Sequence, residues 1–271
     1  MFKSSKKPIL EFKNVSFGYK PKQTILSDIS FSIFENEHVA IIGSNGCGKS
    51  TLGKVIVGLF KPHSGDIYFK NKKIDKLNVN KYRHACGMVF DNPDAQFVGL
   101  TVQDDIAFGL ENQMLPHNKM QEVIDEVSKY TGVFDLLKSS PLDLSGGQKQ
   151  LVAITSVLAM KPDIIVFDEV TSMLDNPSKK TINSLINSLQ KKQHKTIISI
   201  THDMDEALQA DRIIIMNKGK IVSIANPKQT FSKDIKDLSL DKPFIFKLSE
   251  QLGIKPISNL DKLVEEIIHE K

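Results

Sequence analysis

Gly43-Ser44-Asn45-Gly46-Cys47-Gly48-Lys49-Ser50-Thr51 is the stretch of this chain that decides its fold. It matches the pattern G-x-x-x-x-G-K-[ST], in which glycines let consecutive backbone N–H groups turn toward one anion. Residues 37–42 end in a short β-branched run typical of a buried strand, and residues 49–59 carry apolar side chains at helical spacing. This strand–loop–helix context favours a phosphate-binding loop over the alternative, a glycine-rich turn that happens to precede a helix.

The residue types within the loop predict a division of labour on a nucleotide. Lys49 supplies a full positive charge for the β- and γ-phosphates, and the Ser50 hydroxyl is placed to ligate Mg²⁺. The helix that follows adds the partial positive charge of its N-terminus. The sequence therefore predicts ATP and Mg²⁺ as cofactors. The candidate nucleotide-binding residues of the loop are Gly43, Ser44, Asn45, Gly46, Cys47, Gly48, Lys49, Ser50 and Thr51.

A second candidate site, formed by two acidic residues, follows another buried strand. Ile164-Ile165-Val166-Phe167 is a continuous apolar run, as expected for a central parallel strand, and Asp168-Glu169 comes directly after it. Ligands of open α/β sheets sit at the carboxyl ends of such strands. We expect Asp168 to hold Mg²⁺, directly or through water, and Glu169 to polarise the attacking water as a general base. A solvated turn without catalytic function is the alternative.

Three further motifs complete an ordered series. Leu144-Ser145-Gly146-Gly147-Gln148 is followed by Asp168-Glu169, then Ser172-Met173-Leu174-Asp175, and then a strand that ends in Thr201-His202-Asp203. A lone histidine at a strand end is more often structural than catalytic. Taken together and in this order, however, the motifs closely resemble those of ATP-binding-cassette (ABC) ATPases, over residues 9–225.

The resemblance implies roles that spacing alone does not give. Tyr19 occupies the position of the aromatic residue that stacks on adenine, His202 that of the switch histidine at the γ-phosphate, and Asp175 that of the loop residue that links two sites across a dimer. The signature residues Leu144, Ser145, Gly146, Gly147 and Gln148 are expected to reach the nucleotide bound by a second subunit. ATP would thus be closed between two protomers.

A narrower resemblance is carried by Val89-Phe90-Asp91-Asn92-Pro93-Asp94-Ala95-Gln96 and by Thr101-Val102-Gln103-Asp104-Asp105 with the residues after them. These stretches are similar to the ATPases of energy-coupling factor (ECF) transporters, which import vitamins or transition-metal ions. Thr171-Ser172-Met173-Leu174-Asp175 is similar to the first, A-type, of their two ATPase subunits. The alternative is the ATPase of a generic ABC importer.

The chain departs from the family pattern at Asp91, Leu151 and Val170. Asp91 replaces a glutamine that touches Mg²⁺ and couples the site to the membrane partner, so Asp91 is a further candidate metal ligand and coupling residue. Because its side chain is shorter and adds a negative charge, the alternative remains that this chain is a nucleotide-binding subunit with weak hydrolysis. Leu151 replaces an arginine, and Val170 stands where alanine is common, which we attribute to packing.

Composition places few limits on function. A formal charge of +4 is too small to indicate nucleic acid binding, and no stretch approaches the ~18 apolar residues of a spanning helix. No apolar leader follows Met1, so we do not expect secretion. The resemblance implies a peripheral location at the cytoplasmic face of the cell membrane. Cys86 is expected in the core. Cys47 is expected to face the nucleotide, so that a thiol reagent would inactivate the protein and ATP would protect it.

The expected fold class is α/β: an ABC-type P-loop NTPase with a mostly parallel core sheet and an antiparallel β layer from residues 12–34 and 65–69. Residues 1–225 would form the ATP-binding domain, with an α-helical subdomain at about 92–160 that includes a helix ending at Gly132. Residues 226–271 would form a C-terminal helical extension that contacts the dimer partner, with a final helix after Ser258. Packing of that helix on its own domain is the alternative.

The expected partners follow from the resemblance. They are a second ATPase subunit, preferably a related sister chain, a membrane scaffold protein with cytoplasmic coupling helices, and a substrate-binding membrane subunit. The groove for the coupling helices would lie near residues 96–105. Asp104 and Asp105 would pair with basic residues on those helices, or else form a solvated acidic turn. Soluble ABC proteins that act on ribosomes or DNA usually carry two cassettes, whereas this chain has one.

Overall fold

The computed structural model describes residues 7–20, 23–235, 238 and 240–254. Its centre is a six-stranded sheet in the order β10-β9-β3-β8-β7-β6. All neighbours in it run parallel except β10, which pairs antiparallel with β9. Its strands are β10 (Lys220–Ala225), β9 (Arg212–Asn217), β3 (His38–Gly43), β8 (Thr196–Ile200), β7 (Ile164–Asp168) and β6 (Cys86–Val89). Residues of β3 and β7 are buried throughout, which explains the apolar runs at residues 39–42 and 164–167.

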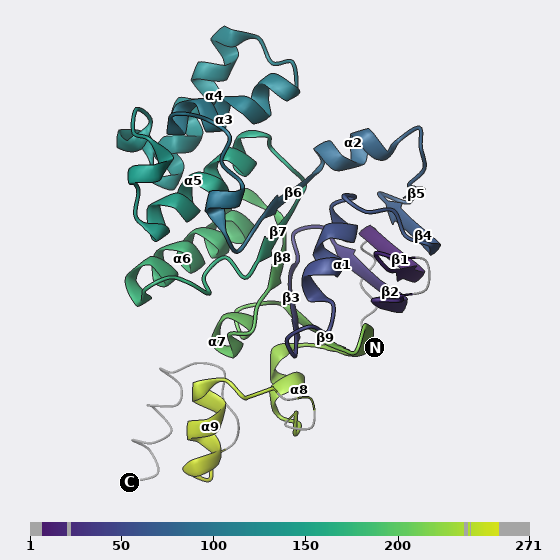
Figure 1. Cartoon of the computed structure of the whole chain (residues 1–271). Helices are drawn as coiled ribbons and strands as arrows, with labels where there is room; N and C mark the ends of the chain where they lie inside the picture. The colour runs from purple at the N-terminus through teal and green to yellow at the C-terminus, as the bar shows by residue number, and fades with distance from the viewer. Residues whose placement is uncertain (1–6, 21–22, 236–237, 239, 255–271) are drawn as a thin grey trace.

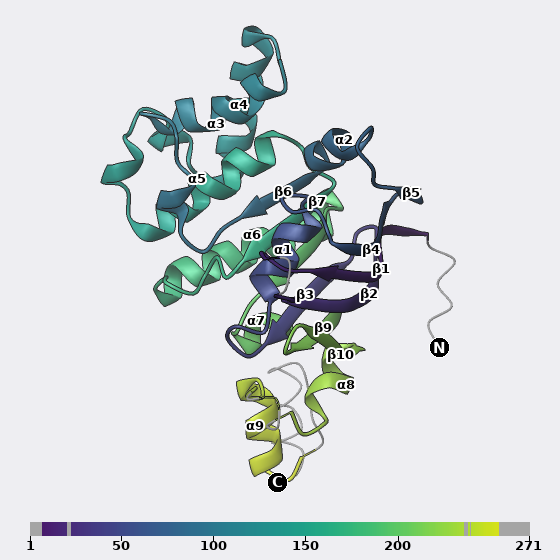
Figure 2. The ribbon, with the colours of Figure 1, turned by 45° about the vertical axis from the view of Figure 1, so that its right-hand side comes forward.

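A four-stranded antiparallel sheet covers one face of this core. Its order is β2 (Leu26–Phe34), β1 (Pro8–Phe17), β4 (Ser64–Phe69) and β5 (Lys72–Lys73). Helix α1 (Lys49–Ile56) lies between the two sheets, and its side chains Leu52, Val55 and Ile56 join both in one apolar cluster. Figure 2 shows this sandwich. The predicted antiparallel layer is confirmed, but α1 ends at Ile56 rather than near residue 59, because Gly58 takes a left-handed backbone.

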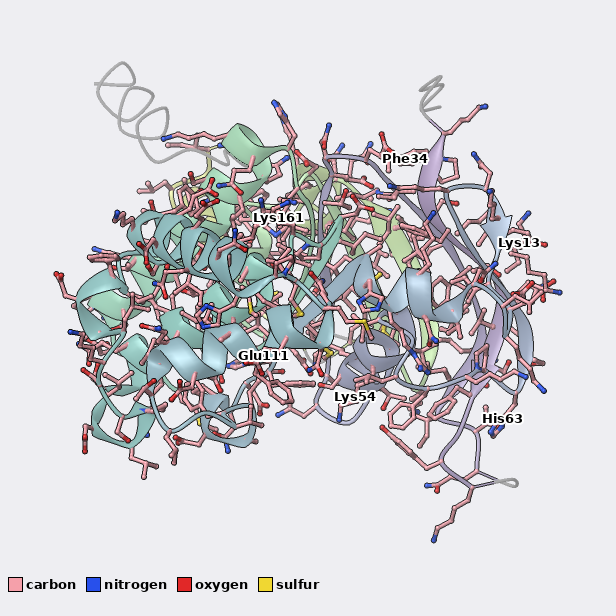
Figure 3. The ribbon with its side chains drawn as sticks, turned by 90° about the horizontal axis from the view of Figure 1, so that it is seen from above. Lys13, Phe34, Lys54, His63, Glu111 and Lys161 are labelled. Atoms are coloured by element: carbon pink, nitrogen blue, oxygen red, sulfur yellow. The ribbon has the colours of Figure 1, made fainter. Side chains whose placement is uncertain are left out.

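Helices fill the segment between β6 and β7. They are α3 (Val102–Asn112), α4 (His117–Thr131) and α5 (Gly146–Ala159), which pack on one another, with α2 (Val79–His84) before β6. Helix α4 ends at Gly132 in a left-handed cap, as the sequence predicts. Helices α5 and α6 (Asn176–Gln193) then pack on β7 and β8. In Figure 3, Lys54 of α1 lies between Glu111 of α3 and His63 beside β4.

The chain after Ala225 lies against the core sheet. Helices α8 (Pro227–Phe231) and α9 (Phe244–Gln251) place Phe231, Ile245 and Phe246 in one buried cluster with α7 (Met204–Ala207) and strands β3 and β9. The backbone N–H of Phe244 also donates to Asp205 on α7 at 3.1 Å. Figure 1 shows α8 and α9 beyond the end of β9. The final helix expected after Ser258 falls outside the described residues.

A buried histidine sits inside the core sheet. His38 is 4% exposed, its Nε2 lies 2.9 Å from Ser199 Oγ, and its Nδ1 has no partner among the described residues. Burial lowers the pKa of His38 to about 4, against a smaller raising effect of Asp211. The folded protein therefore resists protonation of His38, whereas in the unfolded chain this histidine has its ordinary pKa of 6.5.

We expect this histidine to make the fold sensitive to mild acid. The unfolded chain binds the proton between pH 6.5 and 4 and the folded chain does not, so stability is full above pH 6.5 and falls toward pH 4. Lowering the pH from 7.5 to 5.5 should remove about 1.3 kcal/mol from the free energy of unfolding. Urea unfolding at both pH values measures it. The variant His38→Gln should lose most of the difference, while His84→Gln, on exposed α2, should keep it.

Candidate nucleotide-binding site

Three parallel strands deliver the candidate catalytic residues to one edge of the sheet. Strand β3 ends at Gly43, β7 at Asp168 and β8 at Ile200, two residues before His202. The register pairs Ile200 with both Ile41 and Asp168, so the three strands end level with one another. Since their carboxyl ends face the same way, the phosphate loop, the acidic pair and the histidine emerge side by side.

The phosphate loop has the backbone that the sequence predicts. Gly46 and Gly48 have φ values of 76° and 104°, in the left-handed region that favours glycine, and Gly48 is the N-cap of α1. A side chain at Gly43 would overlap the carbonyl oxygen of Met216 on β9, at 2.4 Å from an added Cβ. The glycines thus let the loop turn into the N-terminus of α1, whose partial positive charge suits an anion.

Lys49 is held within this loop. Its Nζ donates to the carbonyl oxygen of Gly43 at 2.9 Å and lies 3.9 Å from Glu169 Oε1. The side chain is buried, so its charge acts in a poorly solvated environment. The structure thus places the expected phosphate-binding cation directly beside the expected general base.

Ser50 and Asp168 form the candidate Mg²⁺ site. The Ser50 hydroxyl donates to Asp168 Oδ1 at 3.0 Å. Burial raises the pKa of Asp168 to about 6, the Ser50 bond lowers it, and the charges of Asp91 and Glu169 raise it further. The exposed Asp91 is therefore within electrostatic reach of the site. Hydroxyl and carboxylate oxygens suit a hard ion such as Mg²⁺, which typically takes its remaining ligands from phosphates and water.

The metal fits these residues only as part of a nucleotide complex. Among the described residues no group of three or more His, Cys, Asp and Glu side chains could hold a metal ion by itself. The sequence reasoning missed Lys54, whose charge lowers the pKa of Asp168. Its position one helical turn after Ser50 on α1 was the available signal.

Glu169 and His202 form the candidate catalytic pair. His202 Nδ1 lies 3.0 Å from Glu169 Oε2, and the two side chains are 55% and 24% exposed. Glu169 has a left-handed backbone with φ 50°, which is uncommon for a residue with a side chain. Its N–H donates to the Ile200 carbonyl at 2.9 Å, which fixes the turn after β7 against the end of β8. Backbone strain of this kind concentrates at functional sites.

Tyr19 lies at the rim of the phosphate loop. Its hydroxyl lies 3.2 Å from Thr51 Oγ1, and its ring packs edge-on against Phe17 and Phe60. The Tyr19 side chain is 52% exposed. An aromatic ring that is held in place and still open to solvent is suited to stacking on a nucleotide base.

The signature residues lie apart from this cluster, at the start of α5. Ser145 is the N-cap and Gln148 completes a capping box, while Ser145 and Gly146 are exposed. Within the described residues no hydrogen bond or ion pair joins residues 144–148 to the phosphate loop. Asp175 is likewise exposed, and although it is the N-cap of α6 its side chain makes no capping bond. In the described structure these residues therefore make no hydrogen bond or ion pair with the phosphate loop of their own protomer.

Two expectations about side chains are wrong. Cys47 is 4% exposed and packs in the core between the two sheets, so its thiol does not face the nucleotide. Burial raises its pKa, which weakens its reactivity, and the expected ATP-protected inactivation by thiol reagents no longer follows. Cys86 and Val170 are buried as expected.

Asp105 is the second correction. It is 5% exposed, and its carboxylate accepts the N–H groups of Val98 and Gly99 and the Ser156 hydroxyl at 2.8, 3.2 and 3.0 Å. It therefore organises the loop before α3 instead of meeting a partner. Asp104 remains exposed while it completes a capping box with Thr101. Gln96 is partly buried and accepts the N–H of Phe90, next to Asp91, at 3.3 Å.

Comparison with known proteins agrees with this geometry. The ABC transporter family matches residues 26–172. The energy-coupling factor transporter ATP-binding proteins EcfA1 of Mycoplasma mobile and Ureaplasma parvum are 46% and 47% identical to this chain. The matches cover 96% and 95% of this chain and 96% and 90% of those proteins.

A solved structure extends the match to three dimensions. CbiO1 of Clostridium perfringens, described as part of the ABC transporter complex cbiONQ, is 36% identical with a TM-score of 0.77. The match covers 83% of this chain and 91% of that one. These findings confirm the fold class and the resemblance drawn from the motifs. The chain belongs to the ABC transporter family, among the ATP-binding proteins of energy-coupling factor transporters.

Proposed function

We propose that this chain binds and hydrolyses ATP as the A-type ATPase subunit of an ECF importer of vitamins or transition-metal ions. The observation that carries the proposal is the set of contacts Lys49–Glu169, Ser50–Asp168 and Glu169–His202 at one sheet edge. Phosphoryl transfer needs a phosphate-binding cation, a metal site and a group that orients water, and these contacts bring all three together.

Each side chain then has a separate task. Lys49 and the loop amides hold the triphosphate, Tyr19 stacks on adenine, and Ser50 with Asp168 holds the metal. Bound Mg²⁺ would neutralise charge on the phosphates. Glu169 accepts a proton from the attacking water, and His202, which already contacts Glu169, keeps that carboxylate oriented and reaches the γ-phosphate.

The second half of the site is proposed to come from a sister ATPase chain. The exposed Ser145, Gly146 and Asp175 lack partners in their own nucleotide site and are free to act across a dimer. A membrane scaffold with coupling helices would dock near Gln96 and Asp104, and a membrane subunit would bind the solute. In the described part of the chain no helix has the length and apolar character to cross a bilayer, so we propose attachment at the cytoplasmic face through these partners.

Reconstitution tests this function. Co-expression with the sister ATPase, scaffold and solute-binding subunit should give a complex that releases phosphate from ATP and drives solute uptake into liposomes. Omission of this chain should abolish both. A complex that assembles and transports without phosphate release, or a chain that never enters the membrane fraction, would contradict the proposal.

Asp91 motivates a second candidate, a subunit with weak hydrolysis. Its charge already disfavours ionisation of Asp168 and would lie near the γ-phosphate. We expect Asp91→Gln to keep or raise the rate of phosphate release, because a neutral side chain of greater reach removes this repulsion. The matched control is Asp94→Asn, which removes the same charge from an exposed residue that pairs with Lys149. A collapse of turnover in Asp91→Gln alone would mean that coupling in this protein depends on the acid.

A further inference from the structure

Glu206 on α7 joins three segments that surround the candidate catalytic pair. Its carboxylate accepts hydrogen bonds from the hydroxyls of Thr171 and Thr201, the latter at 2.9 Å, and from Asn183 Nδ2 at 3.3 Å. Thr171 lies two residues after Glu169, and Thr201 immediately precedes His202. Asn183 lies on α6, the helix that Asp175 begins. We call these four side chains the Glu206 node.

The two threonines of the node are shielded from water, whereas His202 is not. Thr171 and Thr201 are each 3% exposed, while His202 is 55% exposed. Thr201 Oγ1 also accepts the N–H of Asp203 at 2.9 Å, next to His202. Buried hydroxyls without an acceptor are unfavourable, so the carboxylate restrains both threonines strongly. The Glu169–His202 contact is more open to solvent, with His202 55% and Glu169 24% exposed.

The backbone connects the node to the reacting groups over short distances. The N–H of Ser172 donates to the Glu169 carbonyl at 3.0 Å, and that of Leu174 to the Thr171 carbonyl at 3.2 Å. Thr171 thus belongs to the same tight turn as the left-handed Glu169, and this turn runs on to Asp175. Movement of Thr171 relative to Thr201 would change the separation of Glu169 and His202.

We propose that Glu206 is a positioning residue for ATP hydrolysis, holding the turn after Glu169 in register with the turn that carries His202. Through Asn183 it also ties both turns to α6, and so to the loop that ends at Asp175. Glu206 itself contacts neither Glu169 nor His202 in the described structure; it acts through the two threonines. The inference rests on the proposed hydrolytic function.

The test compares Glu206→Gln with wild type in the assembled complex. Glutamine keeps the side-chain volume but replaces one acceptor oxygen with an NH₂ group, which would face the hydrogen-bond donors of Thr171, Thr201 and Asn183. We expect kcat for phosphate release to fall about tenfold to hundredfold, as for other small misplacements of reacting groups, while KM for ATP changes little. Asp205→Asn, which removes a charge from the same helix outside the node, should keep the wild-type kcat. Glu206→Ala is less suitable, because Glu206 already borders a cavity of about 20 Å³.

A second pair of variants separates positioning from folding. Thr171→Val removes the hydroxyl and should lower kcat, whereas Thr171→Ser keeps it and should restore the rate. In a Glu169→Gln background, Glu206→Gln should cause no further loss, because the group it positions is gone. Near-wild-type kcat in both Glu206→Gln and Thr171→Val, with Glu169→Gln inactive, would overturn this inference alone. Normal turnover in Glu169→Gln would instead overturn the proposed function.

Discussion

Replacing Glu169 with glutamine is expected to lower ATP turnover of the assembled transporter at least about 100-fold, while ATP binding is retained. Glutamine has almost the same volume and can occupy the same turn, but it cannot take a proton from water. Lys49, Ser50 and the loop amides, which we propose hold the triphosphate, are unchanged. The variant should therefore accumulate the ATP-bound, closed dimer. Phosphate release measures turnover, and equilibrium binding of a fluorescent ATP analogue measures affinity.

The matched control for this experiment is Glu11→Gln. Glu11 lies on β1 in the antiparallel sheet and pairs with Lys13 at 3.2 Å, away from the three strand ends that form the site. The Glu11→Gln variant should hydrolyse ATP at the wild-type rate. If Glu169→Gln also retained near-wild-type turnover, Glu169 would not be the base and the proposed mechanism would fail.

Replacing Gly146 with aspartate is expected to have the second largest effect. Within its own protomer a side chain is tolerated there, since an added Cβ would meet only Leu174 Cδ2, at 3.6 Å. An acid in the first turn of α5 even suits the helix dipole. Opposite a γ-phosphate in the partner's site, however, the carboxylate would repel the nucleotide. We expect turnover to fall about tenfold or more, a barrier increase of at least about 1.4 kcal/mol.

The readout for this variant is ATP-driven dimer closure. The Glu169→Gln protein with an unchanged signature should shift to a closed dimer on size-exclusion chromatography when ATP is added. Adding Gly146→Asp to this protein should prevent the shift. Gly146→Ala should close more nearly as wild type does. Gly147→Ala differs, because its Cβ would lie 2.4 Å from Ser178 Oγ and should destabilise the protomer itself. Full closure and wild-type turnover in Gly146→Asp would refute the proposal that the signature residues of one protomer contact the nucleotide bound by the other.

The sequence predicted best those features that depend on local pattern. The phosphate loop, the apolar runs of β3 and β7 and the acids that follow them share one cause: parallel strands buried on both faces leave little choice of residue. Order along the chain then identified the family. Helix α3 was not predicted, although Thr101 and Asp104 form a capping box at its start.

The misses concern side-chain direction and long-range contact. Nothing local reveals that Cys47 turns into the core while its neighbours face the anion site, or that Asp105 folds back onto Val98 and Gly99. Glu206 follows His202 by four residues, yet two of its donors, Thr171 and Asn183, are 35 and 23 residues away. Helix α9 is only eight residues long and follows a stretch without motifs, so its burial against α7 had no signal.

The burial of Phe231 and Phe246 against β3 and β9 has a practical consequence for protein engineering. A fragment cut after Ala225, where recognisable motifs end, would bare Ile42, Ile213 and Ile215 to water. Strand β3 leads directly into the phosphate loop, so the damage would reach the nucleotide site. A minimal ATPase excised on motif boundaries should therefore be aggregation-prone, and shorter expression fragments need to retain residues through at least Ile254.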